Sequence, residues 1–230
     1  MSVIPIKDEL PTTSPPVMTV ALIVANVLAF LWQISVGPGQ EYGVTRWGLT
    51  PLELRGIISY AHGAVNAFPV FTIFTSMFLH GGIAHLAGNM LYLWIFGNNV
   101  EDAMGSLRFL SFYLLSGFVA ALAQVFTTSD PTIAMIGASG AVSGVLGGYL
   151  RLHPRARVLT LVPLFFYVSV LHVPAYFFLI LWFAANFLSA MATYGAQGGG
   201  VAFFAHVGGF VAGMLLVRPF LAWAGRARYA

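Results

Sequence analysis

The sequence of 230 residues contains no cysteine and very few charged residues. Without cysteine the chain can form no disulfide framework, no thiol nucleophile and no thiolate metal site. Charged residues make up only 7% of the chain, against about 25% in typical soluble domains. Hydrophobic residues make up 59%. This balance excludes an ordinary soluble globule and predicts a polytopic membrane protein.

Acidic side chains are scarce as well, and all seven fall in predicted loops or at helix ends. Catalysis by paired carboxylates needs embedded acids, so an aspartyl mechanism is excluded. Ion-coupled transporters usually carry intramembrane carboxylates, which leaves transport as the weaker alternative. The chain has no His-Glu-x-x-His run, and His80 and His85 are five residues apart, so a zinc protease is disfavoured. We expect neither a metal nor a cofactor.

Several apolar segments follow one another along the chain. A helix needs about 20 apolar residues to cross the bilayer core. We predict one all-α domain of six transmembrane helices, over residues 17–36, 83–97, 107–126, 139–152, 173–191 and 201–221. The segments 83–97 and 139–152 are short, which is typical of helices that begin beside a water-filled cavity.

The basic residues are distributed unevenly about these six segments. Eight of the ten lysines and arginines fall on one side, and only Arg46 and Arg55 fall on the other. The positive-inside rule then predicts cytoplasmic termini, in a multi-pass protein of the plasma membrane. Residues 1–16 would form a short cytoplasmic segment unlike a signal or transit peptide, 17–222 the helical domain and 223–230 a cytoplasmic tail. The net charge of +3 is not clustered, so we expect no nucleic-acid partner.

Two connections are unusual. The long connector between the first two predicted helices contains apolar runs over residues 52–58 and 68–74, which favour a structure embedded in the outer leaflet. Residues 158–172 are apolar but interrupted by Pro163 and bounded by Pro154 and Pro174, so we interpret them as an interfacial or re-entrant segment. The alternative, a seventh helix, would place the C-terminal arginines outside.

Small residues recur every fourth position in two segments. Gly140 and Gly144 lie in the fourth helix, and Ala205, Gly209 and Gly213 lie in the sixth. This spacing lets helix backbones approach closely in membranes. It is also common in helices that pack in other ways. Here the small faces adjoin a serine and a histidine, so packing them together would bring those two side chains into contact.

The serine is Ser139 and the histidine is His206. A serine hydroxyl becomes a good nucleophile when a neighbouring imidazole accepts its proton. Ser139 also begins a helix after a glycine-containing turn, where free backbone amides can stabilise an oxyanion. The alternative role for an isolated serine here is an N-cap. Titratable groups are costly within a membrane and mark functional sites there, so we favour a nucleophile and its base.

His85 and Asn89 are spaced i and i+4, which places them on one face of the second helix. An imidazole and a carboxamide aimed at one point can donate to a developing oxyanion, and such donors contribute roughly 3 to 4 kcal/mol each. Alone, the pair would more simply be an interhelical hydrogen-bonding pair. Beside Ser139 and His206 we favour the oxyanion role.

Three ordered motifs carry a family resemblance: His80-Gly-Gly-Ile-Ala-His85-Leu-Ala-Gly-Asn89, Gly137-Ala-Ser139-Gly140 and Ala205-His206-Val-Gly-Gly209. Together they resemble the rhomboid family of intramembrane serine proteases, in its compact six-helix prokaryotic form. The resemblance implies cleavage of transmembrane protein substrates within the lipid bilayer, near the outer surface, through an acyl-enzyme.

The resemblance also implies roles for particular residues. Ser139 and His206 would form the catalytic dyad, and His85, Asn89 and the Ser139 amide the oxyanion hole. His80 would support the site from the cavity mouth, and Glu101 would be a structural acid. Gly137, Gly140 and Gly209 belong to the supporting motifs. The fifth helix and residues 194–200 would gate entry.

Two positions depart from the family pattern. Phe71-Thr72 stands where many members have Trp-Arg, and Ser143 stands where some place a tyrosine against the histidine. His206 must therefore be oriented by other packing or by a hydroxyl. The rival hypothesis is a non-catalytic rhomboid-like protein that binds transmembrane helices, against which the intact Ser139 and His206 argue. No pattern in the sequence indicates the oligomeric state.

Overall fold

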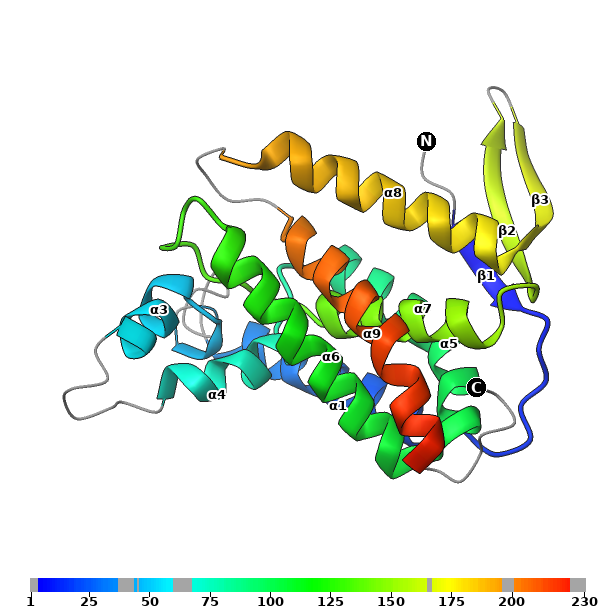
Figure 1. Cartoon of the computed structure of the whole chain (residues 1–230), viewed down its shortest axis with the longest axis horizontal. Helices are drawn as coiled ribbons and strands as arrows, with labels where there is room; N and C mark the ends of the chain where they lie inside the picture. The colour runs from blue at the N-terminus through cyan, green and yellow to red at the C-terminus, as the bar shows by residue number, and fades with distance from the viewer. Residues whose placement is uncertain are drawn as a thin grey trace.

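The computed structural model is a bundle of helices with a small β-sheet at one end (Figure 1). It describes residues 4–36, 44, 46–59, 68–164, 167–195 and 201–223. The elements in chain order are β1 (Ile4–Asp8), α1 (Val17–Ser35), α3 (Pro51–Ser59), α4 (Phe68–Thr75), the 3-10 helix η2 (Ser76–Phe78), α5 (Ile83–Met104), α6 (Ser106–Thr127), α7 (Ser139–Leu152), β2 (Arg157–Leu164), β3 (Tyr167–Pro174), α8 (Ala175–Thr193) and α9 (Phe203–Trp223).

Four helices, α1, α6, α8 and α9, are long and apolar enough to cross a membrane. A fifth candidate span is the pair formed by Phe68–Phe78 and α5, which is bent by 82°. The chain is therefore a multi-pass membrane protein. The remaining predicted span, α7, has 14 residues and is about 21 Å long, less than the roughly 30 Å of the bilayer core. By length, the described residues offer four or five spans rather than six.

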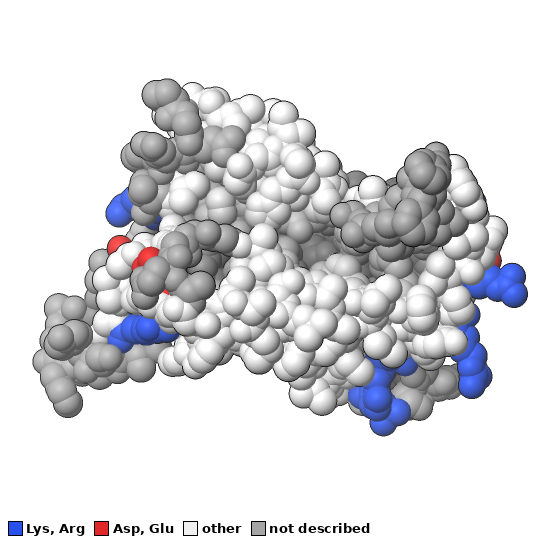
Figure 2. Space-filling view, turned by 90° about the horizontal axis from the view of Figure 1, so that it is seen from above, with Lys and Arg blue, Asp and Glu red and all other residues white. Residues whose placement is uncertain are grey.

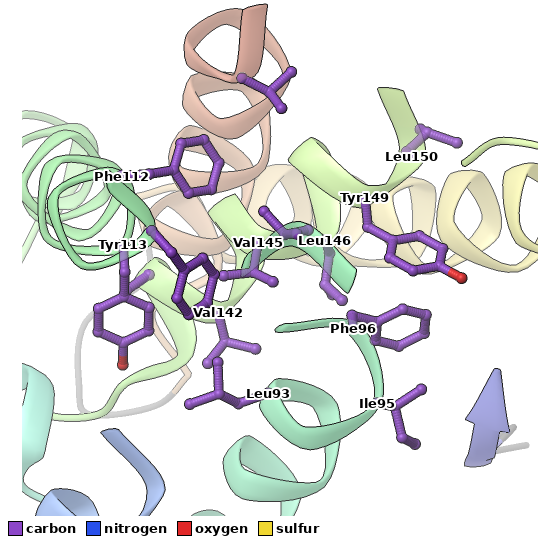
Figure 3. Close-up of a cluster of buried hydrophobic side chains, with 14 of the residues drawn as sticks. Leu93, Ile95, Phe96, Phe112, Tyr113, Val142, Val145, Leu146, Tyr149 and Leu150 are labelled. Atoms are coloured by element: carbon purple, nitrogen blue, oxygen red, sulfur yellow. The ribbon is translucent and has the colours of Figure 1, made fainter. Parts of the chain in front are cut away.

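The short helix α7 lies at the centre of the bundle. Every residue from Gly140 to Leu150 is buried, and α7 packs against α5, α6, α8 and α9. Figure 3 shows side chains of α5, α6 and α7 converging on one apolar core, among them Phe96, Tyr113 and Leu146. Because the longer helices surround α7, it meets protein rather than lipid, so a helix shorter than the bilayer can be stable here.

The α7–α9 contact is made by backbone against backbone. A Cβ added at Gly209 would lie 2.1 Å from the Gly140 carbonyl oxygen, and one at Gly213 would lie 1.8 Å from that of Gly144. Neither distance is compatible with a side chain larger than hydrogen. The two small-residue faces therefore pack together, as their spacing predicts.

The prediction of an all-α protein is wrong, because the described residues include a three-stranded antiparallel sheet in the order β1-β2-β3. The segment interpreted as interfacial or re-entrant is the β2–β3 hairpin, in which Arg157 pairs with Pro174 and Leu164 with Tyr167. The alternative of a seventh helix is also wrong. Valine recurs in both strands of the hairpin, and β-branched side chains favour strands. The N-terminal segment supplies β1, which pairs with β2.

Two neighbouring carboxylates in the last turn of α5 hold the N-terminal segment in place. Glu101 is buried and accepts hydrogen bonds from the Met18 and Thr19 amides, at 2.8 and 2.7 Å, in the first turn of α1. It also accepts from the Ser106 hydroxyl at 2.6 Å. Asp102 accepts from the amides of Thr13 and Ser14. Glu101 thus accepts hydrogen bonds from free amides at the start of α1. Its negative charge also interacts favourably with the helix dipole there.

The described part of the long connector contains α3 and α4. Arg55 of α3 donates to the carbonyl oxygens of Val125 and Thr128, at the end of α6. At the departure from the family pattern, Phe71 is 64% exposed, whereas Thr72 is buried and donates to the Pro69 carbonyl at 2.7 Å. Thr72 is thus buried with its hydroxyl hydrogen-bonded inside α4, and Phe71 points outward.

Charged side chains avoid the middle of the molecule. Figure 2 shows lysines and arginines toward the two ends of the long axis, with an uncharged surface between them. Large apolar side chains are exposed over α1 and α8, including Leu28, Leu181 and Leu188, each more than half exposed. An uncharged belt with exposed apolar side chains is what a surface in contact with lipid requires.

Candidate active site

The structure brings Ser139 and His206 into direct contact. Ser139 is the first residue of α7 and His206 lies in the first turns of α9, so the glycine-mediated packing of these helices places the two side chains together. The Ser139 Oγ lies 2.8 Å from His206 Nε2. This is the distance at which an imidazole can accept the proton of a serine hydroxyl.

The second ring nitrogen of His206 also has a partner. Its Nδ1 lies 2.7 Å from the Oδ1 of Asn186, on α8. The Trp182 ring lies beside the imidazole, with centroids 6.0 Å apart and planes inclined by 35°. His206 is therefore held at its edge and at its face by α8.

Sequence reasoning missed Asn186 as a partner of this histidine. A carboxamide within a strongly apolar helix is costly, and that signal could have drawn attention to it. Its partner could not be read from the sequence, because the contact joins two different helices and 20 residues separate Asn186 from His206.

Ser143 does not replace the aromatic residue that some family members place against the histidine. Its hydroxyl donates to the Ser139 carbonyl oxygen at 2.6 Å, one turn back along α7. The expectation that His206 is oriented by other packing or by a hydroxyl is thus answered by a tryptophan and a carboxamide from a different helix.

The His85 ring lies beside Gly137, two residues before Ser139. Its Nδ1 accepts a hydrogen bond from the Gly81 amide at 3.3 Å, so in the neutral ring Nε2 carries the proton. A Cβ added at Gly137 would lie 2.8 Å from this Nε2 and 3.7 Å from Ser139 Oγ. Gly137 also has a φ of +124°, which a side chain rarely adopts. Only glycine here lets the imidazole donor approach the serine.

Asn89 and His80 form a second pair behind His85. The Asn89 Nδ2 lies 3.0 Å from His80 Nε2, and because an amide nitrogen only donates, one of its two protons remains for another acceptor. His80 is fully buried, and Gln33 of α1 bonds both its amide and its carbonyl, at 3.0 and 2.9 Å. The expectation that His80 lies at the cavity mouth is wrong, because it stands behind the cavity wall.

A cavity of about 850 Å³ joins these groups. Its lining includes His85 and Asn89 from α5, Ser139 from α7, Asn186 from α8 and His206 from α9. Both polar and apolar side chains line it, and it extends along residues 128–136, which precede α7. Such a cavity can admit both an extended segment and water to the serine. Residues 196–200 of the predicted gating loop lie outside the described residues.

The remaining predicted site residues do not line the cavity. Gly140 and Gly209 form the α7–α9 contact, and Glu101 lies at the far end of α5, bonded to α1. Within the described ranges, no three His, Asp or Glu side chains converge as metal ligands do.

The fold and the site define a multi-pass helical membrane protein with a hydrogen-bonded serine and histidine in a partly open cavity. A family model, the Rhomboid domain, matches residues 67–223. This match covers more than half of the chain, so the protein belongs to the rhomboid family.

Known relatives agree with this assignment. The Rhomboid protease GluP of Bacillus subtilis is 45% identical over 78 residues, which are 34% of this chain and 15% of that protein. RHOMBOID-like protein 4 of Arabidopsis thaliana is 34% identical over 158 residues, covering 63% of this chain and 34% of that protein. RHOMBOID-like protein 1 of the same plant is 28% identical over 193 residues, covering 84% and 45%. The chain thus spans less than half the length of each of these relatives.

Proposed function

We propose that this protein is an intramembrane serine endopeptidase that cleaves transmembrane protein substrates. The observation that carries the proposal is the 2.8 Å contact between Ser139 Oγ and His206 Nε2 inside a cavity lined by further hydrogen-bond donors. Membership of the rhomboid family and the names of relatives such as the Rhomboid protease GluP support it.

In the first step, Ser139 Oγ attacks the carbonyl carbon of the scissile peptide bond while His206 Nε2 takes the hydroxyl proton. The tetrahedral intermediate carries a negative oxygen. When it collapses, His206 returns the proton to the leaving amide nitrogen. The product is a new amine terminus and an ester between the substrate and Ser139.

We assign three hydrogen-bond donors to the oxyanion. The Ser139 amide belongs to the first turn of α7, whose N–H groups have no acceptor within the helix. His85 presents its Nε2–H beside Gly137, and Asn89 retains one amide proton. Loss of one such donor costs other serine proteases about 10²- to 10³-fold in kcat.

In the second step, water attacks the ester carbonyl and His206 again acts as the base. Hydrolysis releases the acid product and regenerates the Ser139 hydroxyl. Both steps need water, and polar side chains of the cavity such as Asn89 and Asn186 can hydrogen-bond it. A cavity within the bundle thus supplies, inside a membrane, the water that lipid excludes.

The proposal also covers the route of the substrate and the orientation of the protein in the membrane. We propose that a transmembrane helix enters beside α8, whose outer side chains are apolar and exposed. We further propose that both termini are cytoplasmic in the plasma membrane, since most basic residues lie at the end of the molecule that carries the sheet. Cleavage would then occur near the outer surface.

The test is to incubate the purified protein in lipid with a labile transmembrane substrate, and to compare it with Ser139→Ala and His206→Ala. We expect both variants to lose cleavage, by about 10⁴-fold or more, because each removes half of the nucleophile–base unit. His172→Ala is the matched control, since His172 is half-exposed and pairs with Glu9 at 3.0 Å, in the sheet.

Two results would contradict the proposal. Cleavage that persists in Ser139→Ala would show that another residue is the nucleophile. A folded wild-type protein that cleaves none of several substrates but binds their helices would favour the non-catalytic rhomboid-like alternative.

A further inference from the structure

We propose that Asn186 is a positioning residue for His206, and that the catalytic base is therefore set only while α8 lies against α9. This inference rests on the proposed protease function. It concerns a residue that acts through the histidine rather than on the substrate.

The orientation of the Asn186 carboxamide is fixed by a second hydrogen bond. Its Nδ2 donates to the Trp182 carbonyl oxygen, one turn back along α8, at 2.9 Å. The Oδ1 must therefore face His206, from which it lies 2.7 Å away. The opposite orientation would place Oδ1 against a carbonyl oxygen.

This orientation selects one tautomer of the imidazole. An amide oxygen only accepts, so His206 Nδ1 carries the proton and Nε2 is left with its lone pair toward Ser139. That is the form a general base requires. An aspartate in the corresponding place would select the same tautomer and would also stabilise the charged ring, whereas the neutral carboxamide contributes orientation without a negative charge.

Trp182 completes the support from the same helix. It lies four residues before Asn186, so both side chains project from one face of α8. Its ring contacts the imidazole on one side and stacks against Phe210 of α9, with centroids 6.0 Å apart. In the described part of the chain, the side chains bonded or stacked to His206 at its Nδ1 edge and face thus come from α8 or from its own helix.

The two partners are anchored very differently. His206 lies on α9, which is joined to α7 by the backbone contacts at Gly209 and Gly213. Asn186 lies on α8. Only 22% of the apolar stretch of α8 is buried inside the protein, against 39% of that of α9. A displacement of α8 would carry Asn186 and Trp182 away and leave His206 beside Ser139. The base would then lose its tautomer and its orientation together.

The experiment measures kcat and KM for Asn186→Leu and Asn186→Asp with a transmembrane substrate in lipid, across pH. Leu188→Ala, on the exposed side of α8, is the matched control. We expect Asn186→Leu to lower kcat by about 100-fold, because general base catalysis contributes 10²- to 10⁴-fold, with KM little changed. Asn186→Asp should recover most of the loss and move the acidic limb of the profile to higher pH, because a carboxylate stabilises the protonated imidazole.

Other titratable groups line the same cavity, and their effects are common to all variants. They are His85 and Tyr92 from α5, Asp130 before α7 and Tyr194 after α8. A direct signature separates the bond from these groups. In protein labelled with ¹⁵N-histidine, the Nδ1 proton of His206 should give a low-field resonance in the wild type and lose it in Asn186→Leu, whether or not that variant is active.

The outcomes distinguish this inference from the proposed function. If wild type cleaves and Ser139→Ala does not, but Asn186→Leu keeps kcat, the pH profile and the Nδ1 resonance, the inference is overturned and the protease function stands. A lower melting temperature with unchanged kcat would show a purely structural role and would also overturn it. If wild type cleaves nothing but the Nδ1 resonance depends on Asn186, the positioning bond stands without the protease.

Discussion

The α7–α9 contact and the α8 helix adjoin the same histidine but are built on opposite principles. Between α7 and α9 the backbones touch, and even a methyl group at Gly213 would overlap the Gly144 carbonyl. Over α8, side chains such as Ile180 and Leu188 are more than half exposed. The comparison teaches that the distance between nucleophile and base is fixed by the backbone. The orientation of the base, by the inference above, depends on side-chain contacts from a helix that is largely exposed on its outer side.

The largest effect should come from separating helices α7 and α9. Gly213→Leu would place its Cβ 1.8 Å from the Gly144 carbonyl oxygen, so α7 and α9 must move apart. We expect no detectable cleavage and a loss of about 3 kcal/mol in unfolding free energy, at the upper end of overpacking effects. Unfolding in sodium dodecyl sulfate measures the second quantity. Gly56→Ala, where the added Cβ meets no atom within 4 Å, is the control, and equal damage in both would refute the argument.

The complementary experiment tethers α8 to α5. Tyr92 of α5 and Phe178 of α8 have ring centroids 6.4 Å apart, so cysteines at these positions can be joined by a short thiol-reactive crosslinker. We expect the tether to abolish cleavage of a transmembrane substrate, because the helix cannot enter. Labelling of Ser139 by a small phosphonate should persist, because the dyad stays intact. The unlinked double variant controls for the substitutions, and unchanged cleavage after crosslinking would exclude this route.

The proposed oxyanion donors lie on α5 and α7 rather than on α8. His85→Leu and Asn89→Leu should each lower kcat by about 10²- to 10³-fold with little change in KM, because the donors act mainly in the transition state. The measurement is steady-state kinetics in lipid. Their partner His80 allows a sharper comparison. His80→Leu removes the hydrogen bond to Asn89 and the edge contact with the His85 ring but leaves both donors in place, so it should cost less than Asn89→Leu. A larger loss on changing His80 would contradict this order.

The smallest effect should come from the contacts that join strand β1 to helices α5 and α7. Asp8 of β1 accepts from the Tyr149 hydroxyl of α7 at 2.7 Å and from the Asn99 amide of α5 at 2.6 Å. Asp8→Ala leaves two buried donors unpaired and should lower the unfolding free energy by about 1–3 kcal/mol. Asp8→Asn keeps an acceptor oxygen and should cost less. Equal losses would show that the bonds to Tyr149 and Asn99 do not matter.

The same carboxyl predicts a pH dependence. Burial raises the pKa of Asp8 above its usual value of 3.8, so the folded state binds this proton more tightly than the unfolded state. The contribution of Asp8 to stability is therefore full below pH 3.8 and falls as pH rises through the raised pKa. Unfolding measured across this window should show the decrease in wild type, and Asp8→Asn should remove it. A wild-type contribution that rises with pH would contradict the assignment.

The sequence was most informative where its patterns are local. The bounds predicted for α7 match those observed, because a glycine-containing turn and the polar stretch before it mark its start and His153 and Pro154 follow its end. The packing of α7 on α9 followed from four-residue spacing. The pairing of Ser139 with His206 followed from motifs whose order along the chain is specific. Their catalytic roles remain predictions.

The missed features depend on contacts between distant segments. Strand β1 pairs with β2 across about 150 residues, and no local pattern marks either as the partner of the other. The bond from Asn186 to His206 joins two helices, so the sequence shows a costly carboxamide but not its purpose. His80 was misplaced because its burial depends on Gln33 of α1, 47 residues earlier.

The close contact between α7 and α9 also determines which parts of the chain can change during evolution. Every amino acid other than glycine adds a Cβ, so no single substitution at Gly209 or Gly213 fits the contact between the two helices. The lipid-facing positions of α8, such as Phe177 and Leu181, can exchange one apolar side chain for another at little cost. The outer surface of α8, beside which we propose that a substrate enters, can therefore change while the contact that holds the serine near the histidine cannot.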